Sequence, residues 1–236
     1  MIRIFMLCIG LMTAVTPAHA QLDTLLKDVG LGKKAGLSDP KAAAGLKEAL
    51  QVGAEKAVNL TGRTDGFFAN QAIKILMPEK LRTLEKGLRA VGYGPQLDQF
   101  ILSMNRSAEA AAPAAKKIFV DAITAMTIQD AKQILTGGDT AATDYFRSKT
   151  GDQLSAAFRP YVEKTMGENN VTQQYKALTD RYQAIPFAKS QSLDINGYVV
   201  GKALDGLFHE LGNQERLIRK DPAARTTALL KEVFGR

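Results

Sequence analysis

The chain has 236 residues, with 31 Lys and Arg against 24 Asp and Glu, and its formal net charge is +7. This length can bury a sizeable core, either as one domain or as two small ones. Tryptophan is absent and aromatic residues make up 7% of the sequence, a composition that argues against a sheet-rich fold and favours packed helices.

The first twenty residues have the layout of a secretory signal peptide. A positive charge at Arg3 precedes an apolar run over residues 4–15, and an Ala-x-Ala cleavage site ends at Ala20. The apolar run is shorter than the roughly 18–20 residues that a membrane-spanning helix requires. We therefore predict that residues 1–20 are removed on export and that the protein is periplasmic; an uncleaved membrane anchor is the alternative.

Removal of residues 1–20 would leave 216 residues with a net charge of +6, because Arg3 is lost. Cys8 and His19 would be lost as well, so the mature chain would contain no cysteine and a single histidine, His209. That composition excludes disulfides, Cys/His zinc sites and thiol nucleophiles, and we predict neither a metal nor a cofactor. An exported chain does not normally meet nucleic acid. The weak basic excess therefore indicates anionic lipid or cell-wall polymer, or simply a solvated surface.

The mature chain begins with a short punctuated segment and continues as one helical domain. Residues 21–37 contain several Gly and Lys residues, which predicts a short helix and a linker. Ser38-Asp39-Pro40 opens the next helix, because Ser or Asp is a common cap and Pro suits the first turn. We therefore assign residues 38–236 to the helical domain.

Residues 61–75 are the one long stretch without helical periodicity, and long structured loops are often functional. Phe67 and Phe68 within this stretch could equally plug the helical core. Pro78 begins the next helix, whose apolar side chains share one stripe: Leu81, Leu84, Leu88 and Val91.

Residues 97–126 carry the longest helical pattern in the chain. Apolar or small residues recur there at steps of three and four, which places them on one stripe of a helix: Leu97, Ile101, Met104, Ala108, Ala111, Ala115, Ile118, Ala122 and Met126. The middle of the stripe, residues 108–115, is an alanine seam that either packs closely against another helix of the chain or lines a groove. Pro113 removes a backbone donor, so we expect a kink or break there.

Asn105, Arg106 and Glu109 flank this stripe. Asn105 falls at the boundary of the stripe, and Arg106 lies on the opposite face within i,i+3 reach of Glu109. Two interpretations are open at this point. The three residues are a boundary amide beside a solvated ion pair, or they are a set that anchors a ligand.

Three residues elsewhere in the sequence are candidate partners for that ligand-binding set: Asp65, Asp139 and Arg225. Arg225 could reach a carboxylate through two parallel hydrogen bonds. All six candidate ligand-binding residues could instead merely hold helices in register. None of them is assigned a catalytic role.

Further helix signals follow the central stretch. Thr127 is an expected N-cap with Asp130 at the third helical position. Gly137-Gly138 is expected to end that helix, because glycine adopts the left-handed cap conformation without steric cost. Asp139 or Thr140 is expected to cap the helix that comes next.

Four more helices complete the pattern. Thr150 is expected to cap a helix over residues 151–166, and residues 171–184 form another. A long helix opens at Leu193-Asp194, with His209 off its inward stripe, and Asp221-Pro222 opens the last helix. The expected inward positions are Leu154, Phe158, Tyr161, Val162 and Thr165, then Val200, Leu204, Leu207, Leu211 and Ile218.

No segment shows strand periodicity, so the sequence predicts an all-α protein: a single bundle of about eight or nine helices behind a cleaved signal peptide. Phosphate-loop, dinucleotide, His-Glu-x-x-His and Gly-x-Ser-x-Gly motifs are absent. Carboxylate pairs are the one hydrolytic option left, for example Asp139 with Asp144 or Asp121 with Glu109. The sequence thus argues against an enzyme without excluding one.

Four segments, taken in order, form a recognisable set. They are TDGF at 64–67 with MPEKL at 77–81, SMNRSAE at 103–109, IFVDAI at 118–123 with the stretch 137–146, and ALDGLF at 203–208 with PAARTT at 222–227. Together they resemble the bacterial domain-of-unknown-function family numbered 4197. The resemblance implies an exported, helical, single-domain bacterial protein, and it implies no activity and no catalytic residue.

These observations favour a non-enzymatic binding or interaction protein of the bacterial envelope, with an apolar or anionic ligand or an envelope protein as partner. The export signal, the missing catalytic motifs and the alanine seam motivate this hypothesis. Two alternatives remain. A carboxylate-dependent hydrolase of envelope polymer or lipid would place two acidic side chains in one cleft, at least one with a raised pKa. A homo-oligomeric structural scaffold would be recognised by its size in solution.

Overall fold

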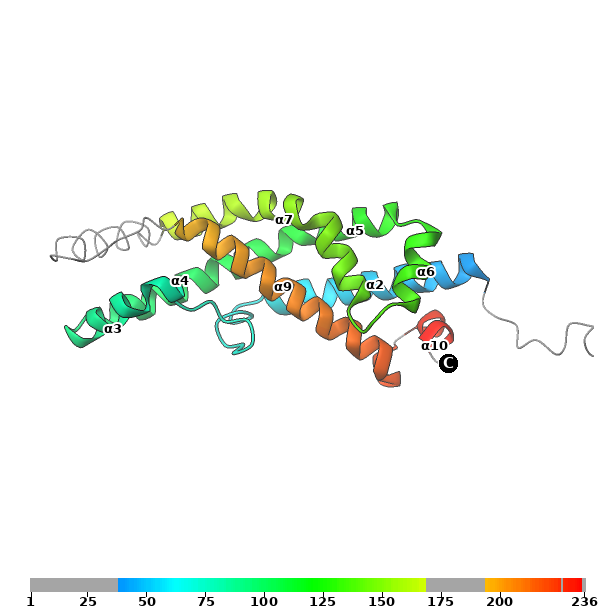
Figure 1. Ribbon diagram of the computed structural model, residues 1–236, viewed down its shortest axis with the longest axis horizontal. Helices are drawn as coiled ribbons and strands as arrows, with labels where there is room; N and C mark the ends of the chain where they lie inside the picture. Colours follow the sequence, from blue (N-terminus) through cyan, green and yellow to red (C-terminus); the bar gives the residue numbers. More distant parts are fainter. Residues whose placement is uncertain (1–37, 169–193, 226, 235–236) are drawn as a thin grey trace, which may run out of the picture. The chain divides into compact units, whose positions relative to one another are not determined.

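The computed structural model describes residues 38–168, 194–225 and 227–234 (Figure 1). Within these ranges the chain forms helices joined by turns and loops, and no strand occurs. The prediction of an all-α protein is therefore confirmed. The expected signal peptide, the linker at 21–37 and the helix at 171–184 lie outside the described residues and stay predictions.

From Asp39 onward the described helices belong to one compact unit. They are α2 (Asp39–Gly62), η1 (Glu79–Leu81), α3 (Arg82–Ala90), α4 (Gly94–Ala111), η2 (Ala112–Ala114), α5 (Ala115–Ala125), α6 (Ile128–Thr136), α7 (Ala141–Glu168), α9 (Ile195–Lys220), η3 (Pro222–Ala224) and α10 (Ala228–Phe234). None of these helices has both the length and the apolar character that crossing a membrane requires.

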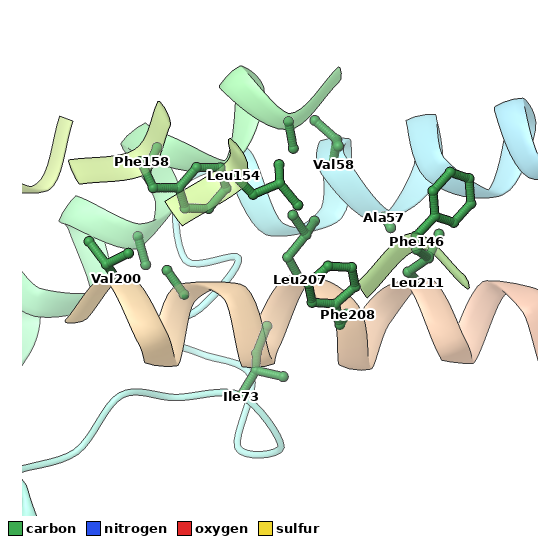
Figure 2. Close-up of a cluster of buried hydrophobic side chains, with 14 of the residues drawn as sticks. Ala57, Val58, Ile73, Phe146, Leu154, Phe158, Val200, Leu207, Phe208 and Leu211 are labelled. Atoms are coloured by element: carbon green, nitrogen blue, oxygen red, sulfur yellow. The ribbon is translucent and has the colours of Figure 1, made fainter. Parts of the chain in front are cut away.

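The core lies where α9 packs against α7 and α2, and where α4 packs against α7. Figure 2 shows side chains from α2, α7 and α9 in this cluster, together with Ile73 from the loop that follows α2. Three aromatic rings meet edge to face: Phe119 lies 5.1 Å from Phe146 and 6.2 Å from Phe208 between ring centroids. Such edge-on pairs stabilise a core beyond the area that they bury.

The apolar stripe of residues 97–126 is buried as predicted except at Ala122, which is half-buried, and it is broken at Pro113. Helix α4 ends at Ala111, one 3₁₀ turn contains the proline, and α5 restarts at Ala115. The alanines of the seam that lie on the stripe, Ala108, Ala111 and Ala115, are completely buried, because α4 packs on α7 and α9 while η2 packs on α2. Of the two expectations for the seam, close packing within the chain is confirmed and a seam that lines a groove is wrong.

Helix α6 shows both a confirmed cap and a corrected one. Thr127 and Asp130 form the expected capping box, with Thr127 Oγ1 accepting from the Asp130 amide at 3.1 Å. The helix ends before Gly137 as predicted, but Gly137 has φ −80° and is not left-handed. Glycine is needed there for space, because a Cβ would lie 2.6 Å from the Cβ of Ala141.

Helix α7 is longer than the sequence suggested. Thr150 is an interior residue, not a cap, and its hydroxyl donates to the carbonyl of Phe146 at 2.7 Å. A threonine that satisfies its hydroxyl on the preceding turn can sit inside a helix without ending it. Tyr161 was expected inward and is 47% exposed, because Val162 takes the buried position beside it.

Two further expectations are corrected at the ends of short helices. Val91 was placed on the inward stripe of α3, and it is 69% exposed because it lies just past the end of that helix. The last helix was expected from residue 223, whereas a 3₁₀ turn at Pro222–Ala224 precedes α10, which begins at Ala228. Asp221 caps that turn by accepting from the Ala223 amide at 2.9 Å.

Replacing Gly206 with alanine tests how closely the loop after α2 packs on α9. A Cβ at position 206 would overlap the ring of buried Phe67 and lie 3.1 Å from the Cβ of Ile73. We expect Gly206→Ala to lower the free energy of unfolding by about 1–3 kcal/mol through overpacking. Urea denaturation followed by circular dichroism measures this change.

Gly201→Ala is the matched control, because it is in the same helix and a Cβ there meets nothing within 4 Å. It should raise stability by about 0.5–1 kcal/mol, since alanine is the better helix former. Equal effects of the two substitutions would contradict the close approach at Gly206.

Candidate functional site

The loop between α2 and η1, residues 63–78, is the longest non-helical segment in the described part of the chain and has a defined conformation. Asp65 has φ 63°, in the left-handed region that Asp tolerates better than most residues. Gly66 follows it, and a Cβ at Gly66 would lie 2.6 Å from the carbonyl oxygen of Thr61. This tight reversal turns the chain from α2 toward α4.

Glu109 of α4 holds the start of the 63–78 loop. Its carboxylate is buried, and Oε1 accepts hydrogen bonds from the backbone amides of Phe67 at 3.0 Å and Phe68 at 3.1 Å. Oε2 accepts from Arg106 Nη1 at 2.6 Å, and Arg106 Nη2 donates to Asp65 Oδ1 at 2.7 Å. The pKa of the Arg106 guanidinium is raised, mainly by its hydrogen bond to Glu109. A loop and a helix are thus joined through charge-assisted hydrogen bonds.

Asn105 holds the other end of the same loop. Its side chain is completely buried, accepts from the Ile75 amide at 2.8 Å and donates to the Ile75 carbonyl at 2.8 Å. The side-chain amide of Asn105 therefore satisfies both backbone groups of Ile75, as the backbone of a neighbouring β-strand would. The expected ion pair of Arg106 with Glu109 forms, but Asn105 and Glu109 are buried rather than at a solvated boundary, because the loop covers this face of α4.

Helix α9 contacts the loop from a second side. Asn70 Nδ2 donates to Glu210 Oε1 at 2.9 Å, and the Tyr198 hydroxyl donates to the Leu76 carbonyl at 3.0 Å. Sequence reasoning missed Glu210 and Tyr198. A signal for Glu210 was present, because it falls three residues after Leu207, on the buried stripe of α9.

Between the loop and α9 lies an open groove of about 440 Å³, which we call the α9 groove. Its apolar lining is Ala72, Ile73, Leu76, Met77 and Gly206, its charged lining is Lys74, Glu79, Arg82, Lys202 and Asp205, and Tyr198 and His209 complete it. Two other hollows in the described ranges are smaller, at about 100 Å³ between α2 and α5 and about 20 Å³ beneath α10.

Four of the five charged groups in the α9 groove are held by exposed ion pairs. Arg82 pairs with Glu79 at 3.1 Å, and Lys202 pairs with Asp205 at 3.4 Å. Exposed pairs of this kind contribute little and rearrange easily. The pKa of the Tyr198 phenol is raised, first by its burial and then by the charge of Glu79, so the hydroxyl stays a neutral donor at physiological pH.

Asp139 and Arg225 do not join the other four predicted residues. Asp139 pairs with Lys220 at the end of α9. The Arg225 guanidinium donates to the carbonyl oxygens of Ile218 at 3.0 Å and Arg219 at 2.8 Å, and so caps the last turn of α9 rather than binding a described carboxylate. Asp65, Arg106 and Glu109 are brought together, and Asn105 holds the same loop. The ligand-binding role of all six stays a prediction.

Glu215 occupies the position in which a cap from Asp139 or Thr140 was expected. It is buried on α9, and its carboxylate accepts from the amides of Ala142 at 3.0 Å and Thr143 at 2.9 Å, at the start of α7. Arg219 donates to the same carboxylate at 2.9 Å. The N-terminus of α7 is therefore capped by a residue more than seventy positions away in the sequence.

The carboxylates named from the sequence as hydrolytic pairs each have another partner. Asp121 forms an ion pair with Lys117, and Asp144 accepts a hydrogen bond from the Thr140 hydroxyl. The pKa of Asp130 is lowered by its hydrogen bonds to Thr127, and that of Asp139 by its hydrogen bond to Lys220. Within the same ranges, no group of three or more His, Cys, Asp or Glu side chains is arranged to hold a metal ion.

The described residues thus define an all-α protein in which a pinned loop and a long helix enclose a groove large enough for a small molecule. A family model with the description "Protein of unknown function (DUF4197)" matches residues 36–235, and the chain belongs to this family. The four ordered sequence segments predicted this membership. No curated protein and no solved structure matches the chain.

Removing the Glu109 carboxylate should release the loop from α4. Glu109→Ala leaves the amides of Phe67 and Phe68 without their acceptor, and we expect a loss of about 2–5 kcal/mol in the free energy of unfolding. Asp121→Ala is the control, because it breaks an exposed ion pair with Lys117 and should change stability by at most about 1 kcal/mol. Equal urea midpoints for the two variants would show that Glu109 is not structural.

The Asp139–Lys220 ion pair predicts that the pKa of Asp139 will change when Lys220 is removed. The pKa of Asp139 lies below its ordinary value of 3.8, so the pair stabilises the fold above that value. This stabilisation is lost as the pH falls through the lowered pKa of the folded state. Carboxyl NMR should show the pKa of Asp139 moving up in Lys220→Ala. An unchanged titration of Asp139 in that variant would contradict the pairing.

Proposed function

We propose that this protein is a non-enzymatic binding protein of the bacterial envelope, exported to the periplasm, and that the α9 groove is its ligand-binding site. The layout of residues 1–20 supports export. The volume of the groove supports ligand binding, since small-molecule sites commonly measure about 300–1,000 Å³.

The observation that carries this proposal is the fixed conformation of one groove wall. The 63–78 loop is held by Asn105 and Glu109 from α4 and by Tyr198 and Glu210 from α9. A connection between two helices needs none of these polar contacts, whereas a binding surface gains from a wall that is ordered before the ligand arrives. In this proposal Asn105, Arg106 and Glu109 position the loop and do not contact the ligand.

The surroundings of the two acidic groups in the α9 groove favour binding over hydrolysis. Glu79 pairs with Arg82, and Asp205 pairs with Lys202 and Arg147. A hydrolase of the expected type needs one carboxyl group with a raised pKa to act as acid. Both side chains are more than half exposed, whereas such an acid sits in an apolar pocket.

A bulky side chain in the groove should abolish binding. Ala72 is exposed and lines the α9 groove, so Ala72→Trp fills it without burying a polar group. Ala69→Trp is the matched control, because Ala69 is exposed in the same loop and does not line the groove. Native mass spectrometry of protein isolated from the periplasm should show a small molecule on the wild type and on Ala69→Trp, and none on Ala72→Trp.

The same spectra test export, because the protein mass should correspond to cleavage after Ala20. Circular dichroism should show the same unfolding temperature for both tryptophan variants. A small molecule that remains bound to folded Ala72→Trp would overturn the assignment of the groove. Protein found with residues 1–20 attached, outside the periplasmic fraction, would overturn the proposed location.

A further inference from the structure

One wall of the α9 groove alternates between buried and exposed side chains. Ile73, Ile75 and Met77 are buried, while Lys74 is half-buried and Leu76 is 54% exposed. This period of two is that of an extended strand, which turns successive side chains to opposite sides. Lys74 and Leu76 therefore point outward, and Ala72, in the turn that precedes them, is exposed as well.

The opposite wall is one face of α9. Tyr198, Lys202, Asp205 and His209 line the groove at helical spacing, over a length of about 16 Å at 1.5 Å per residue. The two walls run in opposite directions, because Tyr198 contacts Leu76 at one end while Gly206 faces Ile73 at the other. Lys74 and Lys202 thus lie at the middle of the groove on opposite walls.

These two lysines are available to a ligand. Lys202 is held only by an exposed pair with Asp205 at 3.4 Å. Lys74 stands 4.0 Å above the ring of Phe68, and no carboxylate of the described residues pairs with it. Arg82 adds a third cation at the Tyr198 end of the groove. Three cations face two carboxylates in the lining, so the groove favours a negatively charged group.

An apolar surface continues from the lysine pair. Leu76 is exposed, and Tyr198 joins it through the hydrogen bond to the Leu76 carbonyl. An exposed leucine on a pinned loop cannot turn inward to bury itself, because Ile75 and Met77 occupy the inward positions on either side of it. A hydrocarbon group of a ligand would cover this surface.

We infer that the α9 groove binds an amphiphilic anion, a molecule with a carboxylate or phosphate head and a hydrocarbon chain. The inference deepens the proposed function and rests on it. The head lies between Lys74 and Lys202, and the chain lies over Leu76 and the Tyr198 ring. Each methylene buried there strengthens binding about fourfold, whereas the head alone meets solvent-screened lysines.

Isothermal titration calorimetry on the purified mature protein tests this inference with four probes. They are dodecyl phosphate below its micelle concentration, inorganic phosphate, the neutral detergent dodecyl maltoside, and vesicles that contain phosphatidylglycerol. Dodecyl phosphate should bind with one-to-one stoichiometry. Inorganic phosphate and dodecyl maltoside should each bind at least about tenfold more weakly, because each lacks one of the two recognised groups.

The double variant Lys74→Glu/Lys202→Glu locates the site. It should weaken dodecyl phosphate binding at least about tenfold. Lys116→Glu/Lys117→Glu, two exposed positions on α5, changes the net charge equally and should leave the affinity within about threefold of the wild type. Lys74→Gln/Lys202→Gln repeats the test if charge reversal disturbs folding, as judged by circular dichroism.

The vesicles distinguish the two sources of such an amphiphile. Sedimentation of the protein with the vesicles, reversed in the Lys74→Glu/Lys202→Glu variant, identifies a membrane phospholipid as the source. Binding of dodecyl phosphate without sedimentation identifies a free amphiphile. Both outcomes support the inference.

Three results would overturn it: equal affinity for dodecyl maltoside, equal affinity for inorganic phosphate, or equal losses in the two charge-reversed variants. If no dodecyl probe binds while Ala72→Trp still removes a co-purifying small molecule, the ligand class is wrong and the binding groove stands. If Ala72→Trp removes nothing, the proposed function fails as well.

Discussion

The contact on which the candidate site depends is the buried carboxylate of Glu109 beneath the amides of Phe67 and Phe68. A chain that leaves a helix and does not enter another has backbone donors that must find acceptors, and burial makes an unpaired donor costly. Glu109 supplies the acceptor for two of them with one side chain, and Arg106 balances its charge. The loop can therefore pack against α4 and α9. The α9 groove forms because the packed loop supplies one of its two walls.

A second buried glutamate, Glu215, accepts backbone amides in the same way as Glu109. Glu215 accepts the first amides of α7 and is balanced by Arg219, which stands four residues later on the same helix. In both places a glutamate on one helix replaces the missing backbone partner of another segment, and a nearby arginine neutralises it. Two regions of irregular backbone are thereby tied to the helices around which the core is built.

Much of the fold follows from residue patterns within single helices. The stripe of residues 97–126, the break at Pro113 and the capping box of Thr127 and Asp130 were all predictable, because each depends on neighbours within four positions. Membership of the family was predictable from four short segments. Local patterns failed at Thr150 and Gly137, where the outcome depended on a hydroxyl bonding within its own helix and on the space beside Ala141.

The candidate site was predictable only in part. Asp65, Arg106 and Glu109 were named together and do meet, because two of them are three residues apart on one helix. The burial of Glu109 was not predictable, because a stripe describes one face of a helix and says nothing of what covers the next face. Tyr198 and Glu210 were missed for the same reason, since their partners lie more than a hundred positions away in the sequence.

The alternation of the 63–78 loop also bears on how the family can vary. Loops usually accept insertions and deletions, because nothing fixes their length. Here, losing one residue between Ile73 and Met77 would turn every following side chain to the opposite side and bring Lys74 or Leu76 to inward positions. The segment has no strand partner, yet its side chains alternate as in a strand, so its length should vary as little as that of the helices it connects.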